Sequence, residues 1–242
     1  VTDFSQLFTD IGYWQNTLNN TQIFKFYSQP WLHYQKLPQS EKDRLITAVN
    51  FLKANKIAIA LEFPAIERTG DELKICGRGV EGTMKTGAAQ LVVSNIKEAG
   101  GIIDFIAMDE PFFYSRYLAS TGYFHPTNKP CLYSNDQLAT AIANTIRIVR
   151  SEFPSVVVGD IEPLYLLKGT AIQDYVSFID KLEVQMGSQL AFVHDDISLI
   201  DQEWKKTVHP LWLLLKERNI AYGVIWNSNI NDPVLIPQIK EY

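Results

Sequence analysis

Acidic and hydrogen-bonding side chains stand directly after short apolar runs at several points along this chain of 242 residues. They are Tyr27, Gln29, Glu62, Asp109, Glu110, Asp160, Glu162, His194, Asp195, Trp226 and Asn227. Carboxyl groups that are held close together can divide the work of acid–base catalysis, because crowding keeps one of them protonated while another is ionised. The pattern therefore indicates a candidate site for general acid and base chemistry, provided that the fold brings these positions together.

The apolar runs before these residues have the length and composition of buried β-strands. They cover residues 23–27, 57–62, 103–109, 156–162, 190–195 and 221–226. Each is apolar nearly throughout, as in parallel strands that are covered on both faces. Stretches with helical spacing lie between them, at residues 40–56, 86–99, 135–152, 170–186 and 199–218. This alternation predicts βαβ units and a parallel sheet.

The placement of the polar residues decides between the two common arrangements of such units. A doubly wound nucleotide-binding sheet carries a glycine-rich loop after its first strand, whereas here the first run is followed by Ser28-Gln29-Pro30-Trp31. Polar residues at the carboxyl ends of successive strands are typical of a (β/α)8 barrel. We predict an α/β fold, a TIM-type barrel that forms a single domain over residues 1–242. Six units are visible instead of eight, so we expect the barrel to be incomplete or irregular.

The strand-end residues of a barrel converge on one mouth, although they are far apart in sequence. Asp160 and Glu162 are two positions apart, so both side chains point to the same face of their strand. Asp109 and Glu110 are adjacent, so only one of them points inward unless the strand bulges. The alternative for each of these acids is a structural role, as the N-cap of the following helix or as a turn residue.

The segment Ile106-Ala107-Met108-Asp109-Glu110-Pro111 resembles the Asn-Glu-Pro strand end of retaining (β/α)8 glycoside hydrolases. The resemblance implies that Glu110 is the acid/base residue. Asp109 replaces the Asn that contacts the sugar 2-hydroxyl in that group. The late strand that would carry the nucleophile in that group ends here at Trp226 and Asn227, without an acid.

We predict a glycoside hydrolase that acts on a poly- or oligosaccharide. Glycoside cleavage requires two carboxyl groups that flank the bond, one protonated and the other ionised. Glu110 is the predicted general acid and Glu162 the predicted second carboxylate, with Glu62 in reserve. Crowding by Asp109 and Asp160 is expected to raise the pKa of at least one of these groups.

The remaining residues of the predicted mouth are candidates for substrate binding. Sugar rings stack on aromatic side chains, and Tyr114 and Trp226 are the preferred platforms, although such residues often serve only in packing. The other candidates are Tyr27, Gln29, His194, Asp195 and Asn227.

Two other functions fit the same residues. One is a metal-dependent hydrolase, because an oxygen-rich site suits Mg²⁺, Ca²⁺ or Mn²⁺. Its ligands would be Asp109, Asp160, Glu162, His194 and Asp195. The other is a catalytically inactive barrel that binds carbohydrate. The predicted reaction requires no cofactor and no metal, its expected partner is a carbohydrate, and the oligomeric state is left open.

Composition and charge exclude several other classes of protein. Apolar residues make up 46% of the chain and aromatic residues 12%, which is incompatible with a disordered chain. No apolar run is long enough for a transmembrane helix. The net charge of −5 without runs of like charge argues against binding to nucleic acid or to an anionic membrane surface.

The two cysteines, Cys76 and Cys131, lie in the long segments after the second and third predicted strands. Neighbouring strands place these segments at the same rim of a barrel, so a disulfide between them is feasible. Such a disulfide would indicate a secreted or periplasmic protein. The alternative is a pair of free thiols in a cytoplasmic protein.

Overall fold

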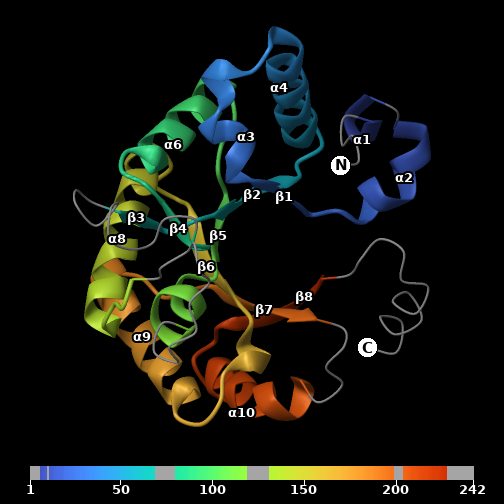
Figure 1. Cartoon of the computed structure of the whole chain (residues 1–242). Helices are drawn as coiled ribbons and strands as arrows, with labels where there is room; N and C mark the ends of the chain where they lie inside the picture. The colour runs from blue at the N-terminus through green and yellow to red at the C-terminus, as the bar shows by residue number, and fades with distance from the viewer. Residues whose placement is uncertain (1–5, 10, 69–79, 119–130, 199–203, 228–242) are drawn as a thin grey trace.

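Six parallel strands form one curled sheet in the computed structural model, which describes residues 6–9, 11–68, 80–118, 131–198 and 204–227. The strands are β1 (Ile23–Tyr27), β2 (Ala58–Phe63), β5 (Phe105–Asp109), β6 (Val157–Glu162), β7 (Phe192–Ser198) and β8 (Ala221–Asn227). They follow one another in the sheet in chain order, with β1 and β8 at its two edges (Figure 1). The predicted α/β fold with an incomplete barrel of parallel strands is confirmed.

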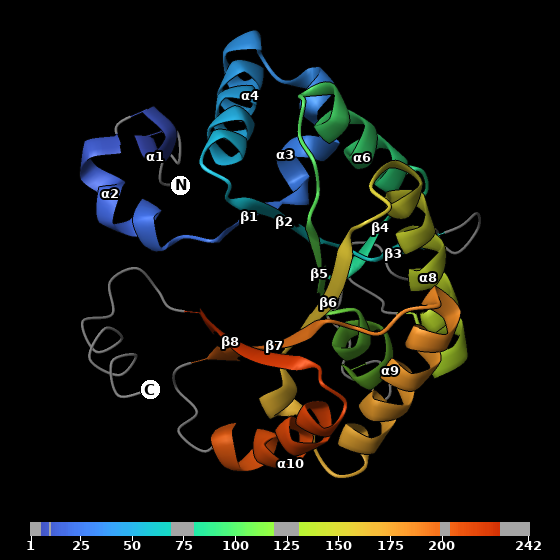
Figure 2. The same ribbon diagram turned by 180° about the vertical axis from the view of Figure 1, so that it is seen from behind.

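Helices cover the convex face of this sheet (Figures 1 and 2). They are α3 (Ser28–Leu32), α4 (Gln39–Ala54), α6 (Ala88–Glu98), α8 (Asn135–Glu152), α9 (Ala171–Met186) and α10 (Trp204–Glu217). Shorter helical turns are η1 (Tyr34–Lys36), η2 (Phe113–Tyr117) and η3 (Leu164–Leu166). Two further helices, α1 (Gln6–Thr9) and α2 (Ile11–Asn20), precede β1 and lie on the open side of the curl. A separate parallel pair consists of β3 (Ile66–Arg68) and β4 (Thr83–Lys85). Among the described residues, no helix is long and apolar enough to cross a membrane.

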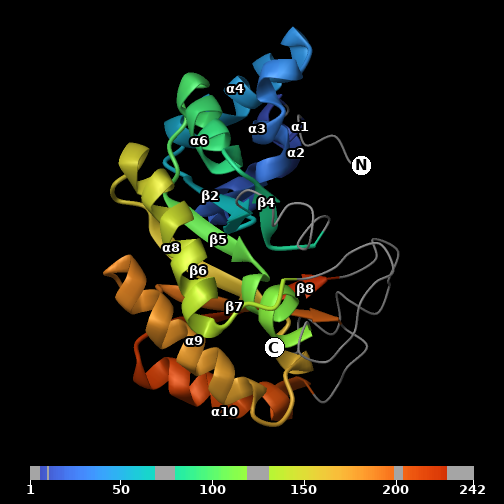
Figure 3. The ribbon, with the colours of Figure 1, turned by 60° about the vertical axis from the view of Figure 1, so that its left-hand side comes forward.

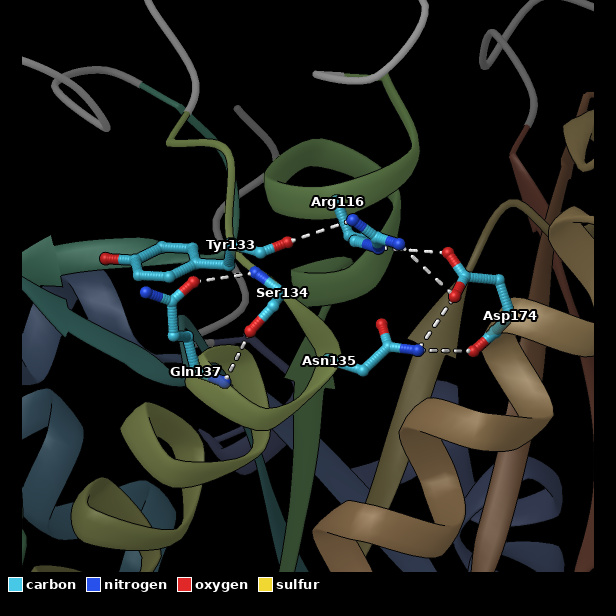
Figure 4. A network of polar contacts seen from close by, with 6 residues as sticks. All are labelled: Arg116, Tyr133, Ser134, Asn135, Gln137 and Asp174. Carbon is cyan, nitrogen blue, oxygen red and sulfur yellow. Dashed lines mark hydrogen bonds and ion pairs between the residues drawn. The ribbon is translucent and has the colours of Figure 1, made fainter.

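Helix α8 illustrates how the sequence determines these elements. Ser134 is its N-cap and forms a capping box with Gln137, in which each side chain accepts a hydrogen bond from the other residue's backbone N–H (Figure 4). Its buried side chains include Leu138, Ile142 and Ile146, which recur at the spacing of one helical face. The helix ends at Glu152, two residues before a proline. The observed bounds agree with those predicted from this pattern.

Strand alternation gives the sheet two distinct faces. On the convex face, side chains such as Leu61, Met108, Val158 and Val193 are buried in the core between sheet and helices. Complete burial of one such side chain contributes about 1.5–3 kcal/mol to stability. Residues one position before or after them point to the concave face. This alternation decides which strand-end acids can meet.

Candidate active site

All the predicted strand-end residues from Glu62 to Asn227 lie at the carboxyl edge of the sheet, because the six strands are parallel and aligned in one direction (Figure 3). This part of the prediction is confirmed. The acids at this edge nevertheless divide between the two faces. Asp160, Glu162 and Asp195 point to the helix layer, whereas a second group of acids faces the concave side.

Asp160 belongs to the helix-facing set. It lies two positions after Val158, whose side chain is part of the core under the helices. Its Oδ2 accepts a hydrogen bond of 2.9 Å from the hydroxyl of Tyr175 in α9, and its side chain is completely buried. Burial raises the pKa of Asp160 well above its usual range, and the hydrogen bond from Tyr175 opposes this rise.

Glu162 shares that face with Asp160, as the spacing predicts. Its Oε1 accepts a hydrogen bond of 2.6 Å from the backbone N–H of Phe112, and its Oε2 accepts one of 2.9 Å from that of Phe113. Its side chain is 1% exposed. Burial, followed by the charges of Asp160 and Glu110, raises the pKa of Glu162, and the two backbone N–H groups oppose that rise. The predicted second catalytic carboxylate thus caps the first turn after β5.

Asp195 repeats this arrangement one strand further along the sheet. Its Oδ1 accepts hydrogen bonds of 2.8 Å and 3.4 Å from the backbone N–H groups of Leu164 and Tyr165, which follow β6. The hydroxyl of Tyr222 donates to its Oδ2 at 3.3 Å. The expectation that all strand-end acids converge on one mouth is therefore wrong for Asp160, Glu162 and Asp195, since their side chains point to the helix layer.

The concave face carries a second set of charged groups. Lys25 of β1 and Glu62 of β2 form an ion pair there. Asp109 ends β5, the next strand in the sheet, with its side chain on the same face as Glu62. Burial raises the pKa of Asp109 to about 7, helped by the negative charges of Glu62 and Glu81 and opposed by Lys25. Asp109 therefore carries a proton over part of the neutral pH range.

Glu110 joins this concave group through an unusual backbone conformation. Its φ is +49°, in the left-handed region that residues other than glycine rarely adopt. Such a conformation costs of order 1–3 kcal/mol and is frequent at functional sites. In a regular strand two adjacent side chains point to opposite faces. The left-handed conformation instead brings the carboxyl of Glu110 to the side of Asp109, whose charge acts on it. Its backbone N–H donates to the carbonyl oxygen of Ile161 in β6 at 2.9 Å, which holds this conformation.

The side chain of Glu110 is 8% exposed and is hydrogen-bonded to Asp196 of β7. Burial raises the pKa of Glu110 to about 9, and the charges of Glu81, Asp196 and Asp109 add to this rise. Because two ionised carboxylates cannot form a hydrogen bond with each other, the bond to Asp196 also favours the protonated form. Glu110 is thus a buried acid that carries its proton at neutral pH.

Gly82 is packed against the backbone of residues 109–111. A Cβ atom at Gly82 would lie 2.8 Å from the carbonyl oxygen of Asp109 and 3.0 Å from the Cα of Pro111. Its φ of +76° is also a glycine conformation. The neighbouring Glu81 is thereby placed close to Glu110 and forms a side-chain hydrogen bond with Tyr114. Burial raises the pKa of the Tyr114 hydroxyl, so it stays a neutral donor.

Two aromatic residues of the predicted site, Tyr27 and His194, also lie on the concave side. Tyr27 is 60% exposed at the end of β1, with the Lys25 Nζ 5.9 Å from its ring centroid. His194 lies opposite Gly223, where a Cβ would be only 2.6 Å from the imidazole Cδ2. Burial, and then the charge of Lys25, lowers the pKa of His194, so the ring is neutral at pH 7.

A polar network attaches the turn that carries Tyr114 to the helices behind it (Figure 4). The Nε of Arg116 donates to the Oδ2 of Asp174 in α9 at 2.9 Å, and its Nη1 donates to the carbonyl oxygen of Tyr133 at 3.4 Å. The Nδ2 of Asn135 donates to the Oδ1 of the same aspartate at 2.8 Å. This network fixes the turn after β5 to both α8 and α9.

Three residues of the concave group were not among the predicted site residues: Lys25, Glu81 and Asp196. Two of them had a signal in the sequence. Lys25 interrupts an otherwise apolar strand two positions before Tyr27, and Asp196 is two positions after His194, so each shares a face with a predicted residue. Glu81 had no such signal, because it is brought here by the β3–β4 pair.

The other predicted residues lie elsewhere or are not placed. Gln29 lines a separate cavity beside α3. Trp226 and Asn227 end β8, but their side chains lie outside the described part of the structure. Cys76 also lies outside it, so the disulfide with the buried Cys131 stays a prediction. Within the described ranges, no three His, Cys, Asp or Glu side chains are grouped so that they could hold a metal ion.

Comparisons with known proteins identify no family. No protein-family model and no curated protein matches the sequence. Among solved structures, the fold is similar to virulence factor SghA from Agrobacterium tumefaciens, at 12% identity over 93% of this chain and 69% of that one, with a TM-score of 0.47. A psychrophilic glycoside hydrolase family 10 endo-beta-1,4-xylanase gives 9% identity over 95% and 86% of the two chains, with a TM-score of 0.45. Morphinone reductase in complex with tetrahydroNAD gives 13% over 85% and 71%, with a TM-score of 0.42. At these TM-scores, function has to be argued from the site itself.

Proposed function

We propose that this chain is a glycoside hydrolase that acts on an oligo- or polysaccharide, with Glu110 as the general acid. The observation that carries the proposal is the buried carboxyl of Glu110, held by a left-handed backbone conformation near Asp109, Glu81 and Asp196; burial and the charges of these three groups raise its pKa to about 9. A general acid must hold a proton at the pH of the reaction and deliver it to the leaving oxygen as the glycosidic bond breaks. Hydrogen bonding to Asp196 positions that proton.

For the second carboxylate we propose Glu62 in place of Glu162. The second group has to be ionised, either to attack the anomeric carbon or to take a proton from water. Glu62 is ion-paired with Lys25 on the concave face, on the strand next to the one that ends in Asp109. Glu162 is engaged through both oxygens with the backbone N–H groups of Phe112 and Phe113. It acts as a positioning residue for the turn that carries the acid.

The concave face of the sheet also carries aromatic side chains on which sugar rings could stack. Tyr27 is exposed beside the Lys25–Glu62 pair, and the hydroxyl of Tyr114 lies close to the proposed acid. We therefore propose Tyr27 as a stacking platform and Tyr114 as a hydrogen-bonding group for the substrate.

The roles of the two carboxyl groups can be separated by the leaving group. Wild-type protein is tested on a panel of 2,4-dinitrophenyl and methyl glycosides. Glu110→Gln should lower turnover of a methyl glycoside by about 10²–10⁴-fold, and much less for a 2,4-dinitrophenyl glycoside, whose leaving group needs no proton. Glu62→Gln should lower turnover of both substrates. Glu41→Gln, in the exposed first turn of α4, is the matched control.

A catalytically inactive carbohydrate-binding barrel is the second candidate, favoured by the absence of an acid at the end of β8. It predicts binding of glycans without turnover of any of them.

The assignment of Glu110 and Glu62 would be contradicted if the variants of both residues turned over the substrates as fast as the wild type does.

We further propose that residues 1–242 form one catalytic domain and that Cys76 and Cys131 are joined in a secreted or periplasmic protein. Proteolytic digestion without a reducing agent, followed by mass spectrometry of the peptides, tests the disulfide between Cys76 and Cys131. Recovery of both peptides as free thiols from protein prepared under oxidising conditions would contradict it.

A further inference from the structure

The turn after β5 is in contact with the concave acids on one side and with the helix layer on the other. It runs from Glu110 to Tyr117 and includes the π-helical segment η2. The side chain of Tyr114 is hydrogen-bonded to Glu81, and its backbone N–H donates to the carbonyl oxygen of Glu110 at 3.3 Å. π-Helical segments are rare and often mark functional sites. The contacts that hold this turn therefore also determine where the proposed acid lies.

Arg116 attaches this turn to α9 (Figure 4). Its Nε donates to the Oδ2 of Asp174 at 2.9 Å, and its Nη2 donates to the Oδ1 at 3.4 Å. The planar guanidinium makes both contacts at once, so the pair fixes the orientation of Arg116 as well as its distance from α9. The side chains are 33% exposed for Arg116 and 35% for Asp174, so the pair contributes little as a charge interaction alone. Its main effect is therefore on geometry.

Asp174 joins the turn, α8 and α9 at one point (Figure 4). Its Oδ1 also accepts a hydrogen bond of 2.8 Å from the Nδ2 of Asn135, the first residue of α8. The same Nδ2 donates to the carbonyl oxygen of Asp174 at 3.1 Å. Tyr133, just before α8, makes two backbone contacts with the turn. Its N–H donates to the carbonyl oxygen of Ser115 at 3.2 Å, and its carbonyl oxygen accepts from the Nη1 of Arg116 at 3.4 Å.

We propose that Asp174, acting through Arg116, is a positioning residue for Glu110. Glu162 holds the start of the turn through two backbone N–H groups, and the Arg116–Asp174 pair holds its end. With only the first of these anchors, the turn could shift relative to β6 and carry the acid with it. A displacement of about 1 Å at a reacting group can lower a rate by about 10²-fold. The catalytic part of this proposal rests on the proposed function, whereas the position of Glu110 can be measured without turnover.

The first test measures the surroundings of Glu110 by urea-induced unfolding of the intact chain. Burial raises the pKa of Glu110 to about 9, so Glu110→Gln should stabilise the protein more at pH 7 than at pH 4.5. This pH-dependent gain should become smaller in an Asp174→Asn background, because a displaced turn exposes Glu110 to water. Asp180→Asn is the matched control, since Asp180 lies on the same helix and pairs with Arg218, outside the turn. The gain should be unchanged in that background.

The second test uses turnover. Asp174→Asn should lower kcat for a methyl glycoside by up to about 10²-fold. It should change kcat for a 2,4-dinitrophenyl glycoside much less, because an effect that acts through the acid disappears when the leaving group needs no proton. Asp180→Asn should be as active as the wild type. Arg116→Lys removes the planar fork and should behave as Asp174→Asn in both tests, which also covers the case that Asp174→Asn does not fold.

The proposal is overturned if the pH-dependent gain is absent in the wild-type background, if it is unchanged in both variants of the pair, or if the Asp180 control reduces it as much. Equal losses of kcat on the two glycosides would contradict it as well. If the wild type turns over no glycoside, the proposed function fails, and the unfolding measurements alone decide the positioning role.

Discussion

Replacing Glu110 by glutamine should stabilise the protein at neutral pH, although it removes the proposed catalytic acid. Glutamine has the size of the protonated glutamic acid, and its amide N–H can donate to Asp196 as the carboxyl O–H does. It has no charge to desolvate at any pH. The wild-type protein must bind a proton at Glu110 in order to fold at neutral pH, because burial raises the pKa of this group to about 9 from 4.5.

The sign and size of the effect follow from these two values. Between pH 4.5 and 9 the folded state holds a proton on Glu110 that the unfolded state has released, so the free energy of unfolding decreases as the pH rises. Each pH unit in this window corresponds to about 1.4 kcal/mol. The free energy of unfolding of Glu110→Gln should therefore exceed that of the wild type by almost nothing at pH 4.5 and by at most about 3 kcal/mol at pH 7.

The assay is urea-induced unfolding of both proteins at several pH values from 4.5 to 8. Glu41→Gln is the matched control, since it makes the same chemical change in the exposed first turn of α4. Its free energy of unfolding should follow that of the wild type at every pH. A stability difference between wild type and Glu110→Gln that does not change with pH would refute the reasoning.

Two further substitutions test the packing around the site. Gly82→Ala should destabilise the protein and lower turnover, because the new Cβ would meet the backbone of residues 109–111. Gly87→Ala has nearly the same φ of +77° but no atom within 4 Å, so urea unfolding should show the smaller loss for it. Tyr175→Phe should cost about 1–3 kcal/mol, because it leaves Asp160 Oδ2 buried without a donor. Removal of the hydroxyl raises the pKa of Asp160 further, so this loss should not decrease as the pH rises; a loss that shrinks with rising pH would contradict this role.

The sequence was sufficient to predict the six strands and their direction, because each run is apolar and is followed by a helical stretch. It was not sufficient to predict the face on which each acid lies. In β6 the residues up to Gly159 carry no polar side chain on either face of the strand. The sequence of residues 156–162 therefore does not show which face is turned toward the helices. In β1, by contrast, Lys25 and Tyr27 alternate with Phe24 and Phe26, and this alternation does identify the concave face.

The conformation of Glu110 could not be predicted for a different reason. A regular strand would have turned either Asp109 or Glu110 away from the concave face. The positive φ of Glu110 depends on contacts with Ile161 in β6 and on the close approach of Gly82, both of which are distant in sequence. Only the short Asp-Glu-Pro resemblance indicated this position.

Glu162 and Asp195 bind turns that belong to the preceding unit, and this affects the order in which the molecule assembles. Glu162, at the end of β6, holds the turn that follows β5, and Asp195, on β7, holds the turn that follows β6. Each turn therefore becomes fixed only after the next strand has joined the sheet. Local opening of one unit releases the turn of the unit before it, so the carboxyl edge should exchange its amide hydrogens as one cooperative group. The proposed acid would then form late in folding, when the neighbouring strand is already in place.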